Sequence, residues 1–430
     1  MNLKQVAIEL FKEGVKAVLP ETLISEVVSQ SPLAVCGVPL EREVYLFGCG
    51  KASKKMAEAI FPFISSCVKG GFVVSSESGE LGNVEIFESA HPIPDVRSIE
   101  AGRKMVEMFK NLKPSQQFIF LLSGGASAMM EVPVPPLTLE EIKTTTKLLL
   151  GCGADIKEIN TVRKHLSLIK GGRLSRYTKA RGIVLVISDV IGDDLETIGS
   201  GLLYKDSTTF KDAKNVLLKY GVYNTVPESV RIVIGKGVSG EIEETPKTEN
   251  PNIKHFIIGN NRKALTHIEN IAKEKGFNTR ILTSLLQGEA KEVGKVMASI
   301  ALESANSGTP VPSPAIILAG GETTVTLKGN GKGGRNQELV LSALKIVGRK
   351  KRVAVLSAGT DGIDGNSPYA GAVCDSETFE NACRFNLDID KFLENNDSST
   401  FFEKAGGVVK TGKTGTNVMD IIIMVVGTAQ

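Results

Sequence analysis

The sequence lacks the cysteine spacing of a zinc site or a disulfide framework. Its six cysteines are scattered over 430 residues, without a CxxC pair and without cysteine–histidine pairing. Zinc sites and disulfide-rich domains both need closely and regularly spaced ligands or partners. The sequence therefore predicts reduced thiols, which are typical of a cytoplasmic protein.

An excess of charge of one sign and long apolar runs are also missing. Lys and Arg number 51 against 48 Asp and Glu, and no basic stripe with interleaved aromatic residues is present, which argues against a nucleic-acid partner. The longest apolar run, residues 421–427, is too short to span a bilayer. Residues 1–20 predict an amphipathic helix rather than a signal peptide, so no membrane partner is expected.

Three common enzyme signatures are absent or out of context. The stretch LLSGGASA lacks the GxSxG elbow of serine hydrolases, and no GxGxxG with an acidic ribose partner occurs. Residues 407–414 fit GxxxxGK[ST] letter by letter. However, they follow a predicted helix and precede a predicted strand, whereas a P-loop joins a buried strand to a helix. A Walker-type fold is therefore rejected.

What the sequence does contain is a repeated pattern of strand, glycine-rich or polar turn, and helix. Apolar runs at residues 44–47, 118–122, 183–187 and 316–319 each end at such a turn. In α/β proteins these turns meet at the carboxyl edge of a parallel sheet, where ligands bind. Because 430 residues exceed one ordinary core, we expect two α/β domains, residues 1–240 and 250–430, with a polar linker at residues 240–246.

The richest of these turns is GNGKGGR, at residues 329–335. Its four glycines leave backbone N–H groups without side-chain cover, while Lys332 and Arg335 add positive charge before a predicted helix. Such a loop suits a phosphate group. For this loop alone, a solvated glycine-rich hairpin is an equal alternative.

Two turns of the N-terminal half carry further candidates. Lys51 stands where a helix is predicted to begin, so its ammonium group can reach a phosphate or a carboxylate; a solvated lysine is the alternative. In the turn after residues 118–122, Gly124 and Gly125 allow a ligand to approach backbone amides, and Ser123 and Ser127 add hydroxyl donors.

Acidic residues follow the strand predicted at residues 183–187. Asp189, Asp193 and Asp194 offer hard oxygen ligands for Mg²⁺ or a base for proton transfer. The alternative is that Asp193 and Asp194 cap the next turn. His91 precedes a proline in HPIPD, and we expect it to orient its loop rather than to act as a base.

The C-terminal half repeats the acidic theme. Asp361 and Asp364 lie in a DGxDG turn and can bind a metal directly or through water, although a structural turn is preferred for this segment alone. Residues 411–417 form a further candidate ligand loop, which includes Thr416 and Asn417.

Together these motifs resemble a known family. The segments GCGKAS, HPIPD, LLSGGASA, NTVRKHLSLIKGGRLS, SDVIGDD, GGETTVTLKGNGKGGRNQEL, AGTDGIDG and TGKTGTNV are similar, in this order, to the glycerate kinases that carry a C-terminal MOFRL domain. The resemblance covers nearly the whole chain. It implies a Rossmann-like N-terminal domain with a mostly parallel sheet flanked by helices, a smaller α/β MOFRL domain, and an active site in the interdomain cleft.

The resemblance also implies ATP- and Mg²⁺-dependent phosphorylation of D-glycerate, usually at the 2-hydroxyl. Four positions depart from the pattern: Ile191, Leu195, Leu202 and Lys413 each replace a proline expected in the family. The glycines and acidic residues of the loops are intact, so activity is expected. The role of Lys413 stays open.

On this hypothesis Lys51 and Arg335 supply positive charge from opposite domains. Asp189 is the hydroxyl base or a metal ligand, and Asp193 is a second metal candidate. We expect the cleft to close on binding, which would exclude water. A homodimer is also left open. The expected binding residues for substrate and nucleotide are Ser123, Gly124, Gly125, Ser127, Glu322, Gly331, Gly333, Gly334, Asn336, Asp361, Thr416 and Asn417.

Two other functions are considered. The first is an NAD(P)H-dependent hydroxypyruvate reductase, a name carried by relatives of this family, which is weakened by the missing dinucleotide motif. The second is a non-enzymatic sensor of a small phosphorylated sugar acid, for which loss of Lys51 or Arg335 would alter binding without any turnover.

Overall fold

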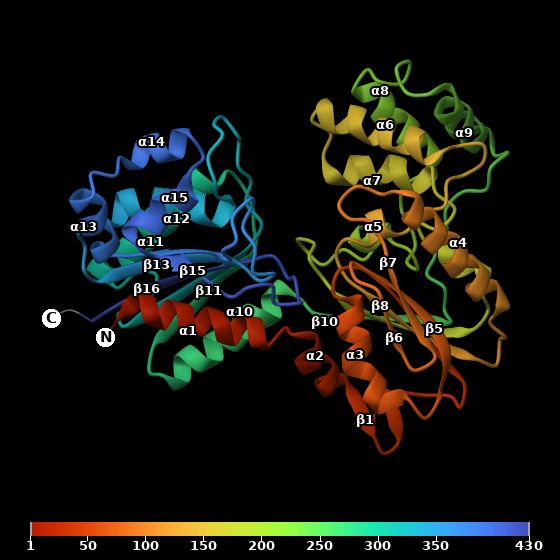
Figure 1. The fold of residues 1–430 in the computed structure, drawn as a ribbon, viewed down its shortest axis with the longest axis horizontal. Helices are drawn as coiled ribbons and strands as arrows, with labels where there is room; N and C mark the ends of the chain where they lie inside the picture. Colours follow the sequence, from red (N-terminus) through yellow and green to blue (C-terminus); the bar gives the residue numbers. More distant parts are fainter. Residues whose placement is uncertain (1, 429–430) are drawn as a thin grey trace. The chain divides into compact units, whose positions relative to one another are not determined.

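The computed structural model describes residues 2–428, which divide into two compact units. One, here called the N-terminal unit, comprises residues 24–258. The other, called the C-terminal unit, joins residues 2–23 to residues 259–428. Figure 1 shows both units and labels many of their helices and strands. No helix within residues 2–428 has the length and apolarity required to cross a membrane.

This grouping differs from the predicted domain ranges, 1–240 and 250–430, at the N-terminus. Helix α1 (Leu3–Lys16) packs against strands β13 and β16 and helix α10 of the C-terminal unit. Its apolar face can be buried only there, because those strands present an uncovered apolar side. Division into functional domains at residues 1–240 and 250–430 stays a prediction.

The segment predicted to be a linker, residues 240–246, is instead fixed within the N-terminal unit. Glu244 Oε1 lies 2.9 Å from His165 Nε2, and Thr245 Oγ1 donates to Asp206 Oδ2 at 3.0 Å. The linker prediction is wrong because these polar side chains, although typical of exposed loops, find buried partners. The boundary between the units falls at strand β10 (Ile253–Gly259).

A seven-stranded sheet organises the N-terminal unit, in the order β10-β9-β8-β4-β5-β7-β6. Strand β8 is buried along its whole length and runs parallel to β4 and β9, as its continuous apolar sequence predicts. Among the strand pairs of this sheet with an assigned direction, only the short β6 and its neighbour β7 are antiparallel. The mostly parallel sheet confirms the predicted α/β class. The strands are β4 (Val44–Cys49), β5 (Val68–Ser75), β6 (Gly79–Leu81), β7 (Val84–Glu88), β8 (Gln117–Leu122) and β9 (Arg181–Ile187).

Helices complete this unit. Helix α9 contains two glycines and several β-branched residues, which have low helix propensity, so the sequence did not predict it. Its residues Val230, Val233 and Ile234 pack into a separate helical core. A small antiparallel sheet of β1 (Val28–Gln30), β2 (Leu33–Val35) and β3 (Val38–Pro39) follows α2. The helices are α2 (Pro20–Val27), which crosses the unit boundary, α3 (Ser53–Ile64), α4 (Val96–Asn111), α5 (Ala126–Met129), α6 (Leu139–Gly151), α7 (Ile156–His165), α8 (Phe210–Lys219) and α9 (Glu228–Ser239).

The C-terminal unit contains a six-stranded mixed sheet, in the order β11-β12-β16-β13-β14-β15. Strand β16, the last of the chain, lies between β12 and β13 and is antiparallel to both. The sheet is therefore completed only when the C-terminal strand is in place. The strands are β11 (Asn278–Leu286), β12 (Ala315–Gly321), β13 (Val353–Gly359), β14 (Gly371–Cys374), β15 (Val408–Val409) and β16 (Asp420–Val426).

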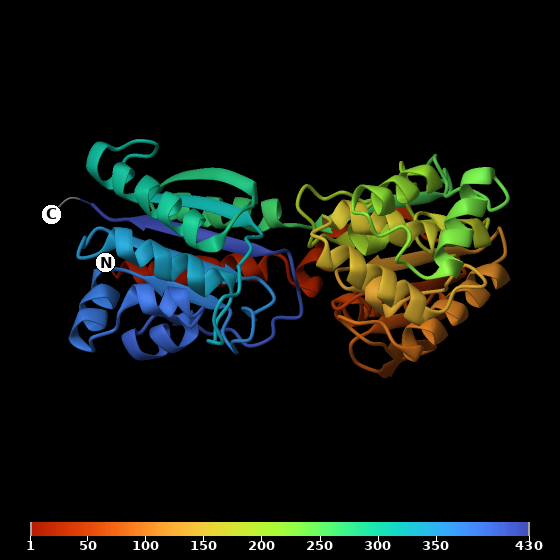
Figure 2. The same ribbon diagram turned by 90° about the horizontal axis from the view of Figure 1, so that it is seen from above.

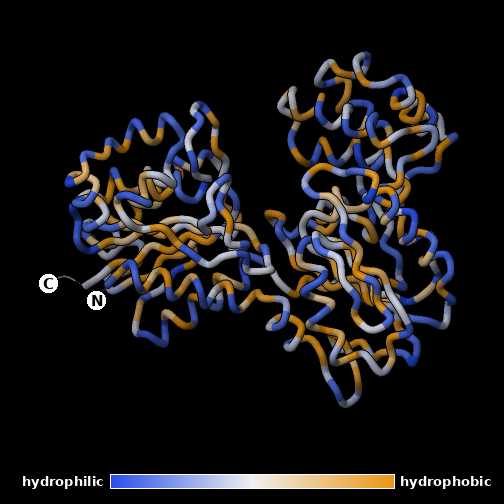
Figure 3. Tube along the Cα trace, viewed as in Figure 1, coloured by the Kyte–Doolittle hydropathy of each residue, from blue (hydrophilic) through white to orange (hydrophobic). Residues whose placement is uncertain are grey.

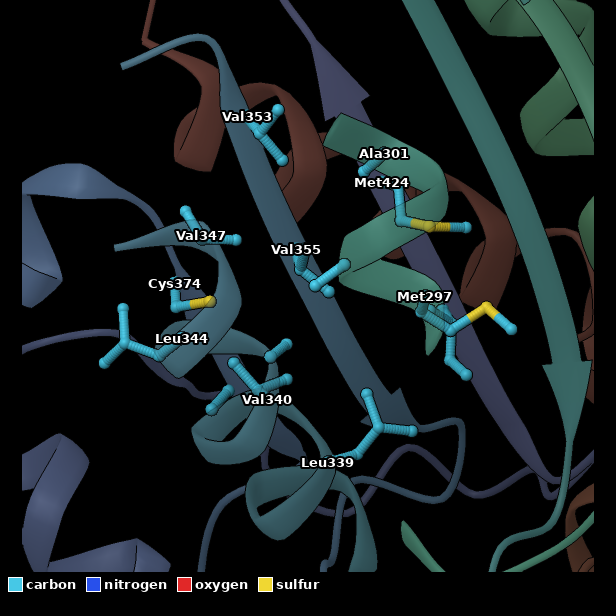
Figure 4. Packing of buried hydrophobic residues seen from close by; sticks show 14 of the residues in the cluster. Met297, Ala301, Leu339, Val340, Leu344, Val347, Val353, Val355, Cys374 and Met424 are labelled. Carbon is cyan, nitrogen blue, oxygen red and sulfur yellow. The ribbon is translucent and has the colours of Figure 1, made fainter. Parts of the chain in front are cut away.

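Helices cover both faces of this sheet, as Figures 1 and 2 show. Alternate residues of β16 serve the two sides: Ile422 and Met424 join the core under α11 and α12, seen in Figure 4, while Ile421 and Ile423 are buried toward α1 and α10. In Figure 3 the strands are the most apolar part of each unit. The helices are α10 (Asn261–Glu274), α11 (Ala290–Ser307), α12 (Arg335–Val347), α13 (Ser376–Arg384), α14 (Ile389–Glu394) and α15 (Ser398–Ala405).

Candidate active site

Three adjacent parallel strands of the N-terminal unit, β4, β8 and β9, end at Lys51, Gly124 and Asp189. The backbone N–H of Lys51 donates to Gly124 O at 2.9 Å. A Cβ atom on Gly124 would lie 1.7 Å from Asp189 Oδ2, so only glycine fits beside this carboxylate. Gly125 has a φ of +89°, and a Cβ there would lie 3.2 Å from Lys51 Cγ. The structure thus brings together three residues that the sequence placed far apart.

Ser123 fixes these turns to one another. Its hydroxyl oxygen accepts a hydrogen bond from Ala52 N at 3.0 Å, and its side chain is buried. A Cβ atom on Gly50 would lie 2.3 Å from Ser123 Oγ, so the two turns touch directly. Ser123 therefore has a structural role here, and its predicted contact with a ligand stays a prediction.

His91 lies beside the same turn. A Cβ atom on Gly125 would come within 2.9 Å of His91 Cδ2 and 3.3 Å of His91 Nε2. Loss of hydration and then the charge of Lys51 lower the pKa of His91 to about 4, so its imidazole is neutral at pH 7. The sequence analysis assigned His91 to loop orientation and left it out of the candidate site; the HPIPD motif was the available signal.

Ser127 belongs to a hydrogen-bonded group behind the turn. Its Oγ lies 2.5 Å from Ser200 Oγ, and Ser200 Oγ donates to Asn160 Oδ1 at 3.3 Å. The guanidinium of Arg163 donates to the carbonyl oxygen of Ser127 at 3.0 Å. Of this group, only Ser127 was predicted as a binding residue. The motif NTVRKHLS held the signal for Arg163, but the period of a helix does not show which turn it faces.

The acidic residues after β9 divide into two roles. Asp194 accepts hydrogen bonds from Glu196 N and Thr197 Oγ1 at 3.0 and 2.8 Å, so it caps the following turn, as the alternative reading expected. Within residues 2–428, no group of three or more His, Cys, Asp or Glu side chains is placed to hold a metal ion. Magnesium binding by Asp189 and Asp193 stays a prediction.

In the C-terminal unit, Arg335 begins α12 and is held by two carboxylates. Its Nε and NH2 donate to Asp420 at 2.6 and 3.1 Å, and its NH1 lies 2.6 Å from Glu322 Oε1. Burial is the largest single effect and lowers the pKa of Arg335, but the charges of Asp420, Glu322 and Asp364 and the hydrogen bond to Asp420 together raise the pKa overall. The positive charge predicted at Arg335 is therefore present, and it is paired with Asp420 and Glu322. Asp420 was missed because it lies far along the chain.

Asp364 caps the same helix from within the core. Its carboxylate accepts hydrogen bonds from Asn336 N and Gln337 N at 3.0 and 2.8 Å. Burial raises the pKa of Asp364 to about 7, against the effect of these N–H donors. Asn336 also donates to Asp420 and accepts from Ser357 Oγ, which gives it a structural role beside its predicted ligand role.

The glycine-rich loop, residues 329–334, differs from its predicted form. Its N–H groups are not uncovered: Gly331 N donates to Asn395 O at 2.9 Å, Lys332 N to Asp397 Oδ1 at 2.9 Å, and Gly333 N to Asn366 Oδ1 at 2.8 Å. The prediction of bare amides is wrong, because Asn366 and the distant segment 395–397 supply acceptors. The glycines are needed instead for close packing: a Cβ on Gly334 would lie 2.3 Å from Asp364 Oδ1.

The remaining candidates lie in turns of the C-terminal unit. Asp361 Oδ1 accepts from Ile363 N at 3.1 Å, as in a structural turn. Thr416 Oγ1 donates to Val18 O at 2.7 Å and so ties its loop to the N-terminal segment. Asn417 Oδ1 accepts from Met419 N at 3.0 Å. Contact of these side chains with a ligand stays a prediction. Lys413 is exposed.

Comparison with known proteins identifies the family. Residues 6–235 match a domain of unknown function, DUF4147, and residues 315–420 match the MOFRL family. The chain is 40% identical to glycerate 2-kinase from Pyrococcus horikoshii, over 99% of this chain and 98% of that protein. It is 41% identical to D-glycerate 2-kinase from Thermotoga maritima, over 98% of each. A putative hydroxypyruvate reductase from Agrobacterium vitis is 36% identical, over 99% of this chain and 95% of that protein.

Solved structures agree with the sequence comparison. The crystal structure of glycerate kinase from Thermotoga maritima matches with a TM-score of 0.90 at 41% identity, covering 99% of each chain. A protein from Pyrococcus horikoshii matches with a TM-score of 0.88 at 39% identity, covering 100% of this chain and 99% of that one. The resemblance inferred from the motifs is thereby confirmed, and the chain belongs to the family of glycerate kinases that combine a DUF4147 domain with a MOFRL domain.

Proposed function

We propose that this protein transfers the γ-phosphoryl group of ATP to the 2-hydroxyl of D-glycerate and so forms 2-phosphoglycerate. The observation that carries the proposal is the meeting of Lys51, Gly124 and Asp189 at three adjacent strand ends. It occurs in a chain that is similar from end to end to two glycerate 2-kinases. A carboxylate and a cation brought together in this way are groups that phosphoryl transfer to an alcohol uses.

Each group has a chemical task in this proposal. Asp189 accepts the proton of the attacking hydroxyl, the new O–P bond forms at the γ-phosphorus, and ADP leaves with the electrons of the broken P–O bond. The ammonium group of Lys51 offsets the negative charge on the transferred phosphoryl group. The neutral imidazole of His91 adds no charge beside Lys51.

Magnesium is assigned to the nucleotide phosphates, with Asp189 and Asp193 as protein ligands. Carboxylate oxygens at a strand end are ligands of the type that Mg²⁺ prefers, and the ion commonly keeps several waters and needs few protein ligands. When bound, it would neutralise phosphate charge. Because the two Asp residues offer few ligands, we expect most of the coordination to come from ATP and water.

Arg335 is assigned to a phosphate group in its own unit. Its bond to Glu322 is the one that a phosphate can replace, because the Glu322 side chain is 42% exposed whereas that of Asp420 is 5% exposed. Asp420 would then keep the guanidinium oriented. The candidates Gly331, Gly333, Gly334, Asn336, Asp361, Thr416 and Asn417 are kept as nucleotide or substrate contacts of the C-terminal unit.

The test is incubation with ATP, Mg²⁺ and D-glycerate, with the product identified by NMR, which separates 2- from 3-phosphoglycerate. Lys51→Met and Asp189→Asn should each lower kcat at least about 100-fold, while the exposed Lys69→Met should not. Removal of Mg²⁺ with EDTA should stop turnover. Absence of any phosphoglycerate with Mg²⁺ or Mn²⁺ would overturn the proposal.

Hydroxypyruvate reduction is kept as a second candidate because the Agrobacterium vitis relative is named for it. The missing dinucleotide motif argues against it. Consumption of NADH or NADPH with hydroxypyruvate, at a rate comparable to kinase turnover, would favour this alternative. A cytoplasmic location and a homodimer also remain predictions, to be tested by cell fractionation and by analytical ultracentrifugation.

A further inference from the structure

We propose that Arg163 binds the carboxylate of the acceptor substrate, at an anion site formed by α7 and the turn that carries Ser127. The inference rests on the proposed kinase function, since it assigns the substrate acid to a particular side chain. Arg163 is separate from Lys51 and Asp189, and its role would be recognition of the substrate rather than transfer of the phosphoryl group.

The guanidinium of Arg163 is anchored but largely unused. Its NH2 donates to Ser127 O at 3.0 Å, and this is its only hydrogen bond to the residues that the structure describes. A guanidinium carries five N–H donors, so most of them are left for a ligand. The side chain is partly exposed, and neither its Nε nor its NH1 is a buried nitrogen without a partner, in contrast to Nε of Arg173.

The charges around Arg163 do not balance. Lys170 is fully buried and forms an ion pair with Glu131, which is 2% exposed. Arg163 is close enough to this pair for Glu131 to raise its pKa, although burial has the larger effect and lowers it. Burial likewise lowers the pKa of Lys170 to about 8; Glu131 opposes this shift, and Arg163 adds to it. Two cations therefore share one carboxylate.

Arg163 shares the carboxylate of Glu131 with a fully buried lysine, so its charge is only partly compensated by the protein, which favours binding of an anion. This charge lies close to the proposed reaction centre, because Ser127, which accepts from Arg163, is only two residues from Gly125, and Gly125 lies against Lys51. Two residues of chain span at most about 7 Å. Arg163 and Lys51 thus contact residues of the same short turn.

The chemistry of the side chain favours a carboxylate. The planar guanidinium matches the two oxygens of a carboxylate and can donate to both, whereas an ammonium acts as a point charge. A phosphate oxygen pair has similar geometry, so the nucleotide is the other source of this chemistry. If Arg163 binds the carboxylate, its replacement weakens the binding of glycerate. If it binds a phosphate, its replacement weakens the binding of ATP.

The experiment compares Arg163→Met with Arg103→Met, an exposed arginine on α4, in the full-length protein. Arg163→Met should raise KM for D-glycerate about 10- to 100-fold, the range for loss of charged hydrogen bonds, with KM for ATP within about twofold. The Kd of D-glycerate, measured by calorimetry without ATP, should rise by a similar factor. Arg103→Met should change neither constant.

The outcomes separate this inference from the proposed function. If the wild-type protein makes phosphoglycerate but Arg163→Met leaves KM and Kd for D-glycerate within twofold, the inference is refuted. A rise confined to KM for ATP also refutes it and assigns Arg163 to a phosphate. If the wild type makes no product, the proposed function fails, and the glycerate titration alone decides whether Arg163 binds the acid.

A second variant covers the case in which Arg163→Met does not fold. Arg163→Lys keeps the charge and loses the planar pair of donors, so KM for D-glycerate should rise by a smaller factor, about 5- to 20-fold. With glycerol as acceptor, which lacks the carboxylate, the wild type and Arg163→Lys should have similar kcat/KM. A loss of equal size with glycerol and with D-glycerate would contradict carboxylate recognition.

Discussion

Replacing Glu131 by glutamine should be the most damaging change in the buried charge cluster of the N-terminal unit. Glu131 is the only carboxylate of this cluster, which we define as Glu131, Arg163 and Lys170. Glutamine has nearly the same shape and can still accept the hydrogen bond that Val132 N gives to Oε1 at 3.0 Å. The substitution therefore changes charge rather than packing.

The expected size follows from burial. Lys170 and Glu131 have side-chain exposures of 0% and 2%, so neither charge is compensated by water when its partner is lost. Breaking a buried ion pair from one side costs about 3–5 kcal/mol. Glu131→Gln leaves the buried Lys170 and the partly exposed Arg163 without a carboxylate, and we expect a loss within this range.

Removal of a cation should be milder. Lys170→Met leaves one cation and one carboxylate, Arg163 and Glu131, so the net charge of the cluster becomes zero. We expect a loss of about 1–3 kcal/mol. The double variant Glu131→Gln, Lys170→Met should be more stable than Glu131→Gln alone by about 2 kcal/mol, because it removes one of the two stranded cations.

The measurement is urea unfolding at pH 7, followed by hydrogen exchange of the peptide that contains β8. This peptide reports on the N-terminal unit alone, which matters because a protein of two units need not unfold in one step. The matched control is Glu140→Gln, which breaks an exposed pair with Lys143 and should cost less than about 1 kcal/mol. A Glu131→Gln variant no less stable than Lys170→Met would refute the charge count.

Two further predictions concern the strand ends and the core of the C-terminal unit. Gly124→Ala should abolish most glycerate kinase activity in the NMR assay of phosphoglycerate formation, because its Cβ would lie 1.7 Å from Asp189 Oδ2. The control is Gly151→Ala, whose Cβ would meet nothing within 4 Å. Equal activity of the two variants would contradict the packing argument. Asp364 has a pKa raised by burial to about 7, so the folded state binds this proton more tightly than the unfolded state. The stability from this group is fully present below about pH 4 and is lost as pH rises through 7, by at most about 4 kcal/mol. Asp364→Asn should remove that part of the pH dependence of the unfolding free energy, measured with urea between pH 5 and 8. It should also cost about 1–3 kcal/mol, because the new NH2 group would face a backbone N–H. An unchanged slope of the unfolding free energy against pH would contradict the raised pKa of Asp364.

Strong local patterns were sufficient for much of the fold. The apolar run at residues 118–122 became the buried strand β8, and Asp95, the last residue of HPIPD, caps α4 by accepting from Arg97 N at 2.9 Å. The order of the motifs also identified the family. These features depend on neighbours in sequence, through the periodicity of apolar side chains and the needs of turns and helix ends.

Weak local patterns failed. Helix α9 was missed because its glycines and β-branched residues have low helix propensity. The fixed segment 240–246 was missed because polar composition does not show whether buried partners exist elsewhere. The glycine-rich loop failed for a related reason: its composition indicated free N–H groups, whereas residues 395–397 occupy them in the folded protein.

The sequence by itself determined the α/β class, the strand-end turns and the identity of the family, because each is encoded in residues close together along the chain. Only the tertiary structure decided how charges are paired. Arg335 meets Asp420 across 85 positions, and Lys170 meets Glu131 across 39. The physical reason is that a buried charge is stable only beside an opposite charge or a hydrogen-bond partner in space, and separation along the chain does not report distance in the folded protein.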